Sequence, residues 1–425
     1  MDGHYLKGQM KMSPKEPHKW TFRARFRRNA FGWRSQPAIR RIKEAVSEIK
    51  KTARKDPVLG AEGAVLLLEK LSPAIAHVDS SSGAIGTAVN HAVETLVPII
   101  ANAPADETLR GKWLDRLWEA IQDDDMPYIE SLSEFWGALC VTSECASRWA
   151  DTFLSTVRAM WQSSPEQQGF FKGTTACLSA LYTAGRNEDI LDLLKLSPYK
   201  FWSYHQWGVR ALAAMGRKAE ALRYAEDCRG PYVNSSEIAE ICEEILLSSG
   251  MAEEAYRRYA IEANQKTTWL ATFRAVSKKY PRKAAGEILR DLVKSTPGVE
   301  GKWFAAAKSA GLYREAIELA NRTPCDIRTL IRAARDMAKS QPEFAVEAGM
   351  AALRWLVQGY GYEITGLDVR DAYQHTMNAA EHAGARPETF ERIRKLVAGE
   401  VCGERVVTRA LGQELGLDEL LKKDL

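Results

Sequence analysis

A turn residue, most often glycine, recurs at nearly constant intervals from residue 177 onward, each time between two stretches whose apolar residues have helical spacing. The four clearest turns lie at Gly185, Gly216, Gly250 and Gly311. Two further units turn at Pro281 and near Pro342, which gives intervals of 31, 34, 31, 30 and 31 residues, and a looser unit turns at Gly384, 42 residues on. A hairpin of this size buries its apolar face only against its neighbours, so the pattern predicts stacked helical hairpins.

Each unit carries the local signals of two helices joined by a tight turn. A glycine just past a helix can adopt the left-handed conformation that satisfies the last carbonyls. Four residues later an acid falls in the first turn of the second helix, where the helix dipole favours negative charge; these acids are Asp189, Glu220, Glu254 and Glu315. The next position is mostly small, which lets the paired helices approach closely: Ala221, Ala255, Gly286 and Ala316, with Ile190 as the exception.

These features resemble tetratricopeptide-like helical-hairpin repeats over residues 170–400, with a period near 31 rather than 34 residues and without the full aromatic and proline signature of that family. The whole chain also resembles an uncharacterised all-helical family common in bacteria. The resemblance implies an all-α fold, an α-solenoid of tetratricopeptide-like hairpins with an N-terminal helical region, whose concave surface binds other proteins.

Helical spacing continues upstream of the repeats, with turn signals between five segments: Ala61–Leu71, Ile85–Ile100, Thr108–Ile121, Tyr128–Leu139 and Glu144–Trp161. The stretch QSSPEQQG at 162–169 is the best linker candidate. We therefore divide the chain into a basic aromatic arm and amphipathic helix (1–56), an N-terminal helical region (57–165), a tetratricopeptide-like repeat array (166–400) and a charged C-terminal tail (401–425).

Charge is distributed unevenly along the 425 residues. The net charge of the chain is +4, but residues 1–55 hold 16 basic and 4 acidic residues, whereas residues 56–425 carry a net charge of −8. A basic segment on a mildly acidic body predicts an anionic partner, or docking of the segment onto its own body.

The cysteines and the apolar runs indicate the compartment. Seven cysteines without a CxxC pair predict a reduced chain with buried thiols, and Cys140 and Cys145, five residues apart, suit neither a zinc knuckle nor a redox pair. The start of the sequence lacks the apolar core of a signal peptide, and no apolar run approaches the ~18 residues of a membrane-spanning helix. We expect a cytoplasmic protein without a membrane span.

The most distinctive local motif is KWTFRARFRRNAFGWR at residues 19–34, followed by a basic amphipathic helix after Pro37. In an extended segment its aromatic residues and its arginines would occupy opposite faces. Arginines interleaved with aromatic rings can neutralise phosphates and stack on bases. The candidate nucleic-acid-binding residues are therefore Trp20, Arg23, Arg25, Arg27, Arg28, Trp33, Arg34, Arg40, Arg41 and Lys43.

Two alternatives to nucleic-acid contact stay open for this motif. The aromatic face can pin the arm to the acidic body while the arginines are solvated outside. The basic helix can also lie on an anionic membrane, although Glu44 and Glu48 dilute its positive charge.

A second aromatic motif, YKFWSYHQW at residues 199–207, precedes the Gly216 turn. Such a cluster can form an interface hot spot, which makes Tyr199, Trp202, Tyr204 and Trp207 candidate partner-binding residues. The alternative is that these rings form the core between neighbouring hairpins.

The sequence offers no catalytic, cofactor or metal site. Asp125 is expected to cap a helix near Pro127 rather than to bind a cation with Asp123 and Asp124. His375 and His382 lie seven residues apart on one helix face, about 10.5 Å along its axis, too far to share one zinc ion. Nucleotide-binding, hydrolase and kinase signatures are missing from the sequence.

The sequence thus favours a non-enzymatic helical-repeat scaffold that binds a protein or peptide partner along its concave surface. The alternative is a nucleic-acid-binding protein that contacts phosphates through the basic arm. An unrecognised hydrolase or nuclease built on an acidic cluster is the third reading, because catalytic groups are recognised by geometry rather than by motif.

Overall fold

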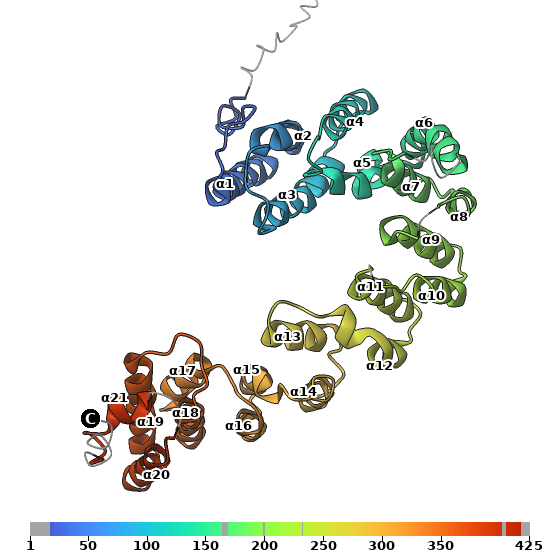
Figure 1. The fold of residues 1–425 in the computed structure, drawn as a ribbon. Coiled ribbons are helices and arrows are strands. Elements are labelled where there is room, and N and C mark those ends of the chain that lie inside the picture. Colours follow the sequence, from blue (N-terminus) through green and yellow to red (C-terminus); the bar gives the residue numbers. More distant parts are fainter. Residues whose placement is uncertain (1–17, 164–168, 199, 232, 402–404, 418–425) are drawn as a thin grey trace, which may run out of the picture. The chain divides into compact units, whose positions relative to one another are not determined.

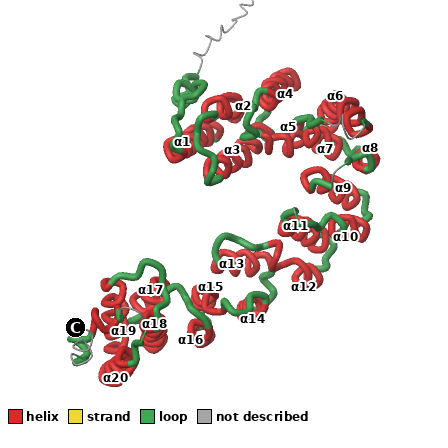
Figure 2. Tube along the Cα trace, in the orientation of Figure 1, coloured by secondary structure: helices red, strands yellow, loops and turns green. Residues whose placement is uncertain are grey.

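The computed structural model describes residues 18–163, 169–198, 200–231, 233–401 and 405–417, and over these residues the chain is all-helical (Figures 1 and 2). The all-α prediction is confirmed. The chain divides into two compact units, Met1–Val233 and Asn234–Leu425. The linker predicted at 162–169 lies mostly outside the described residues.

Ten α-helices and a short 3-10 helix build the described part of the N-terminal unit, each packing on neighbours close in sequence. Their bounds are α1 Ser35–Ala53, α2 Pro57–Ile75, α3 Ala84–Ala101, α4 Glu107–Gln122, η1 Glu130–Phe135, α5 Trp136–Cys140, α6 Ser143–Gln162, α7 Thr174–Thr183, α8 Asn187–Leu194, α9 Trp202–Ala214 and α10 Lys218–Glu226. Helices α1, α2 and α3 all contact one another, and their apolar faces form one core with the helices that follow.

The described part of the C-terminal unit is built in the same way from eleven α-helices and one 3-10 helix. Their bounds are α11 Ser235–Leu247, α12 Ala252–Ala263, α13 Trp269–Lys279, α14 Ala285–Lys294, η2 Glu300–Trp303, α15 Phe304–Ser309, α16 Tyr313–Arg322, α17 Ile327–Met337, α18 Pro342–Val357, α19 Gly366–His382, α20 Arg386–Ala398 and α21 Val406–Leu411. Helix α18 contacts α17, α19 and α20, so contacts again join helices close in sequence.

The predicted turn glycines have the predicted conformation. Gly185, Gly216, Gly250, Gly311 and Gly384 all have φ between +67° and +79°. After each one, the next amide donates to the carbonyl five residues back, as from Arg217 to Leu212 at 2.9 Å, which is the Schellman arrangement. The acids expected in the first turn of the following helix are there, and the residues next to them at 190, 221, 255 and 316 are fully buried.

Gly216→Ala tests how strictly these turns require glycine. With φ at +79° the added methyl meets no atom within 4 Å, so the cost comes from backbone conformation alone. We expect a loss of about 1 kcal/mol in unfolding free energy, measured by urea denaturation. Gly86→Ala is the control, because Gly86 lies inside α3 and its added methyl also meets nothing within 4 Å. An equal change in the free energy of unfolding in both variants would contradict the requirement for glycine at this helix cap.

The five helices predicted upstream are found, with one correction. The segment predicted at Tyr128–Leu139 consists of the 3-10 helix η1 and the short helix α5. Asp125 does not cap a helix at Pro127; instead the buried Asp124 accepts hydrogen bonds from the Ser72 hydroxyl and, at 2.8 Å, from the Ile129 amide. Burial raises the pKa of Asp124, although both hydrogen bonds oppose that rise. The sequence could not show this contact because Ser72 is distant in the chain.

Helix α3 is unusually apolar along its whole length, although Glu94 and Pro98 lie within it. Among the described helices it alone is long and apolar enough to cross a membrane by length and composition. Of its residues 39% are buried, and these include most of its large apolar side chains, which pack on α1 and α2. The absence of a membrane span therefore stays a prediction.

Candidate docking groove on the N-terminal unit

Within residues 18–34, three aromatic rings pack inward while the arginines are exposed. Trp20, Phe22 and Phe26 are 6, 3 and 1% exposed, and successive ring centroids lie 5.3 and 6.2 Å apart. The backbone is turned, since the amides of Arg25 and Phe26 both donate to the Phe22 carbonyl. The segment is therefore turned rather than extended, and the turn brings all three rings to the same side of the segment. The separation of aromatic from cationic residues holds.

The arm packs against α2. A Cβ at Gly63 would lie 2.2 Å from the Trp20 ring, so the indole fits only because this position is glycine. The Asn29 amide donates to the Pro73 carbonyl at 2.8 Å, which satisfies one of the last carbonyls of α2. Over the described residues, the arm thus packs on its own body.

The arm also forms ion pairs or hydrogen bonds with both acidic residues of α1. Glu44 forms an ion pair with Arg25 at 3.0 Å, and Arg41 joins it at 2.6 Å. Glu48 accepts hydrogen bonds from the amide and hydroxyl of Thr21, at 2.9 and 2.5 Å. These cations and the Arg41 hydrogen bond lower the pKa of Glu44. As a result, the acids of α1 face the arm, and the opposite side of the helix has only cationic charges.

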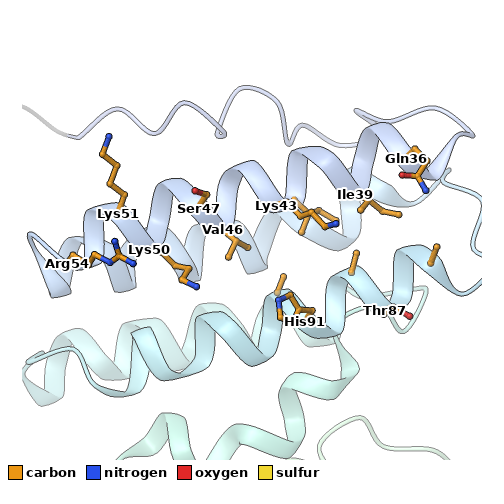
Figure 3. Close-up of a pocket in the computed structure, with 14 residues that line it drawn as sticks. Gln36, Ile39, Lys43, Val46, Ser47, Lys50, Lys51, Arg54, Thr87 and His91 are labelled. Carbon is orange, nitrogen blue, oxygen red and sulfur yellow. The ribbon is translucent and has the colours of Figure 1, made fainter. Parts of the chain in front are cut away.

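On that opposite side, α1 and α3 enclose a groove of about 1020 Å³ (Figure 3). Its apolar lining comes from Ile39, Ile42, Val46, Ala84, Ala88 and Ala92. Its basic and polar lining comes from Gln36, Lys43, Ser47, Lys50, Lys51, Arg54, Thr87 and His91. Both helices contribute residues three or four positions apart, so each presents one stripe to the groove. In Figure 3, Lys50 and Arg54 lie on the α3 side of α1, whereas Lys51 points away from α3.

The four groove cations have no ion-pair or hydrogen-bond partner in the part of the chain that the structure describes. This holds for Lys43, Lys50, Lys51 and Arg54. The acid nearest the groove on α3 is Glu94, which lies 3.8 Å from His91. The groove therefore combines an apolar floor with unneutralised positive charge.

The predicted nucleic-acid-binding residues fall into three environments. Trp20 is buried. Arg25, Arg40 and Arg41 converge on Glu44, within 3.9 Å. The remaining candidates are exposed, with Trp33 at 72%, and this set is Arg23, Arg27, Arg28, Trp33, Arg34 and Lys43. Of the ten, Lys43 alone lines the groove.

The aromatic motif before Gly216 lies mostly inside the N-terminal unit. Trp202 and Trp207 are each 7% exposed, and the Trp207 ring lies 5.8 Å from Tyr182. Tyr204 is half-buried against Trp161, and Tyr199 lies outside the described residues. This burial favours the core alternative, and a partner-binding role for these rings stays a prediction.

The described ranges contain no candidate metal-binding cluster. They hold no group of three or more His, Cys, Asp or Glu side chains placed to bind a metal ion. The thiols of Cys140 and Cys145 do contact each other, which their spacing had not suggested, and this hydrogen bond lowers the pKa of Cys145 to about 7. Both thiols are buried, and the charged groups acting on Cys145 are the guanidinium groups of Arg148 and Arg110 rather than a histidine base.

Sequence reasoning missed most of the groove. It identified the apolar stripe of α1 and named Lys43, but Lys50, Lys51 and Arg54 were not selected. The contribution of α3 to the groove could not be predicted from the local sequence, because residues 84–92 approach α1 only through tertiary packing. The available signal was the combination of an apolar stripe and lysines at helical spacing on α1.

Comparison with known proteins adds no family assignment: no protein-family model matches the chain, and no curated protein matches it either.

Proposed function

We propose that this protein is a non-enzymatic scaffold that binds a protein or peptide partner. Its helices would form an α-solenoid of tetratricopeptide-like hairpins, with the groove between α1 and α3 as a docking site. The recurrent glycine cap supports the hairpin assignment. The observation that carries the binding function is the groove itself, since it offers apolar surface and unpaired charge together. Apolar surface rimmed by polar residues marks interaction sites on proteins.

A peptide-display selection on the immobilised full chain tests this function. We expect enriched segments whose binding is lost in Val46→Asp, because that change places a carboxylate on the groove floor. Leu367→Asp is the matched control, since Leu367 is 69% exposed in the other unit. Failure to enrich any segment, or equal loss in both variants, would contradict a docking role for the groove.

A second candidate function is nucleic-acid binding through the arm. It is favoured by four exposed arginines without a partner in the described residues: Arg23, Arg27, Arg28 and Arg34. The buried rings of the arm cannot stack on bases, so contact would be to phosphates and would weaken steeply with salt. Fluorescence polarisation with single- and double-stranded DNA and RNA, at about 50 and 200 mM salt, separates the two functions. Tight, salt-sensitive binding that is lost in Arg27→Glu with Arg28→Glu would favour this one.

A further inference from the structure

We infer that the α1–α3 groove binds an acidic amphipathic helix of a partner protein. The inference rests on the proposed scaffold function and specifies the partner's chemistry. Three observations carry it: the half-buried apolar floor of the groove, the one-sided charge of α1 and the parallel stripes that line the groove.

The apolar surface requires an apolar occupant. The large apolar side chains of α3 beside the groove are buried, but two of its small apolar residues at the groove are not fully covered. Ala84, Ala88 and Val46 are half-buried at the groove, above the buried side chains of Ile39 and Ile42. Removing such surface from water is favourable in proportion to its area. A polyanion such as RNA could form ion pairs with the lysines, but it would leave the apolar floor of the groove exposed to water.

The charge requires an acidic occupant. Both carboxylates of α1 are bound by the arm on the far side of the helix, through Arg25 and Thr21. Lys43 and Lys50 lie seven residues apart, two turns along the same face, and Arg54 extends the row by another turn. An acidic side chain on each flank of an incoming helix would meet these cations, and a basic helix would be repelled.

The shape favours a helix over an extended strand. The described residues expose no sheet edge to which a strand could add. The lining residues of α1 run from Gln36 to Arg54, so the groove follows a helix of 19 residues, about 28 Å long. A helix laid along it would place apolar residues at i, i+3, i+4 and i+7 against the two stripes, as in other helix-in-groove complexes.

The test measures binding of labelled peptides to the full chain by fluorescence polarisation at about 50 mM salt. The first probe is a designed helix of about 18 residues with leucines on one face and glutamates flanking them. The second has the same composition in an order that scatters the leucines, and the third carries lysine for every glutamate. We expect the first to bind at least about tenfold more tightly than either of the others.

Variants locate the binding site. Lys43→Glu with Lys50→Glu should weaken the acidic helix at least about tenfold, whereas Arg27→Glu with Arg28→Glu, the same charge change on the arm, should alter it less than about twofold. Ala88→Phe fills the groove without changing charge, so it keeps the test valid if charge reversal perturbs folding. Equal binding of the scattered peptide, or equal loss in both charge variants, would overturn the inference.

Failure of the inference and failure of the scaffold function give different results. If the basic or the scattered peptide binds and Ala88→Phe abolishes that binding, the groove docks proteins of another chemistry, and the acidic-helix inference alone fails. If no peptide binds while RNA or DNA binds and the arm variant abolishes it, both fail. Binding only to vesicles of anionic lipid would likewise overturn both.

Discussion

Replacing Glu243 with leucine is expected to destabilise the C-terminal unit by about 3 to 5 kcal/mol. This carboxylate is fully buried on α11. It accepts hydrogen bonds from Asn264 at 2.8 Å and from the Tyr280 hydroxyl at 2.6 Å, and it pairs with Lys279 at 2.5 Å. The three partners follow α12 or belong to α13 and its end, so one side chain joins three helices. Leucine would remove the acceptor of the Tyr280 hydroxyl, of one N–H of the Asn264 amide and of the Lys279 ammonium.

The measurement is urea denaturation combined with hydrogen exchange, which assigns the loss to residues 234–401. Glu244→Leu is the matched control, because Glu244 is the next residue on the same helix but is exposed, and it should change stability by less than about 0.5 kcal/mol. Glu243→Gln should fall between the two, since an amide oxygen can still accept a hydrogen bond but the charge facing Lys279 is lost. Equal stability of the leucine variant and its control would contradict the role of this cluster.

The second large effect is expected at Gly63, where an alanine should displace the arm. Its methyl would lie 2.2 Å from the Trp20 ring, and real Cβ contacts are never that close. Displacing the buried Trp20 ring from this packing site should lower the free energy of unfolding by about 3 kcal/mol. Trypsin would then cleave rapidly after Arg23 and Arg25. Displacement should also leave Glu44 without its Arg25 partner and so weaken acidic-peptide binding in the groove.

Two further variants serve as controls for Gly63→Ala. Gly86→Ala inserts an identical methyl into open space on α3 and should leave the arm protected. Trp20→Leu combined with Gly63→Ala should restore part of the protection, because a smaller side chain leaves room for the methyl. Unchanged trypsin sensitivity of Gly63→Ala would show that the arm is not held at this glycine.

The fold could be predicted wherever a few neighbouring residues decide the structure. A glycine such as Gly216 sets its own turn through its left-handed backbone, and the acid and small residue that follow it fix the start of the next helix. The same reasoning placed α1 after the arm. It failed for Tyr128–Leu139, where Asp124 is held by the distant Ser72 and the chain forms a 3-10 helix first.

The candidate site was harder to predict because its properties arise from long-range packing. The sequence showed that the arm has aromatic and cationic residues, but Gly63 on another helix decides that Trp20 is buried. Glu44 and Glu48 appeared to dilute the positive charge of α1, and only the packed arm shows that they face away from the groove. The partner surface on α3 is likewise set by tertiary contacts.

Photo-cross-linking from inside the groove tests the central claim most directly. A benzophenone amino acid at Thr87, which lines the groove, is compared with one at Arg28, which is exposed on the arm. With the acidic amphipathic peptide present, the account predicts cross-links from position 87 at several peptide leucines three or four residues apart, and few from position 28. Cross-links from position 28 in equal or greater yield would contradict it, because the peptide would then contact the arm rather than the groove.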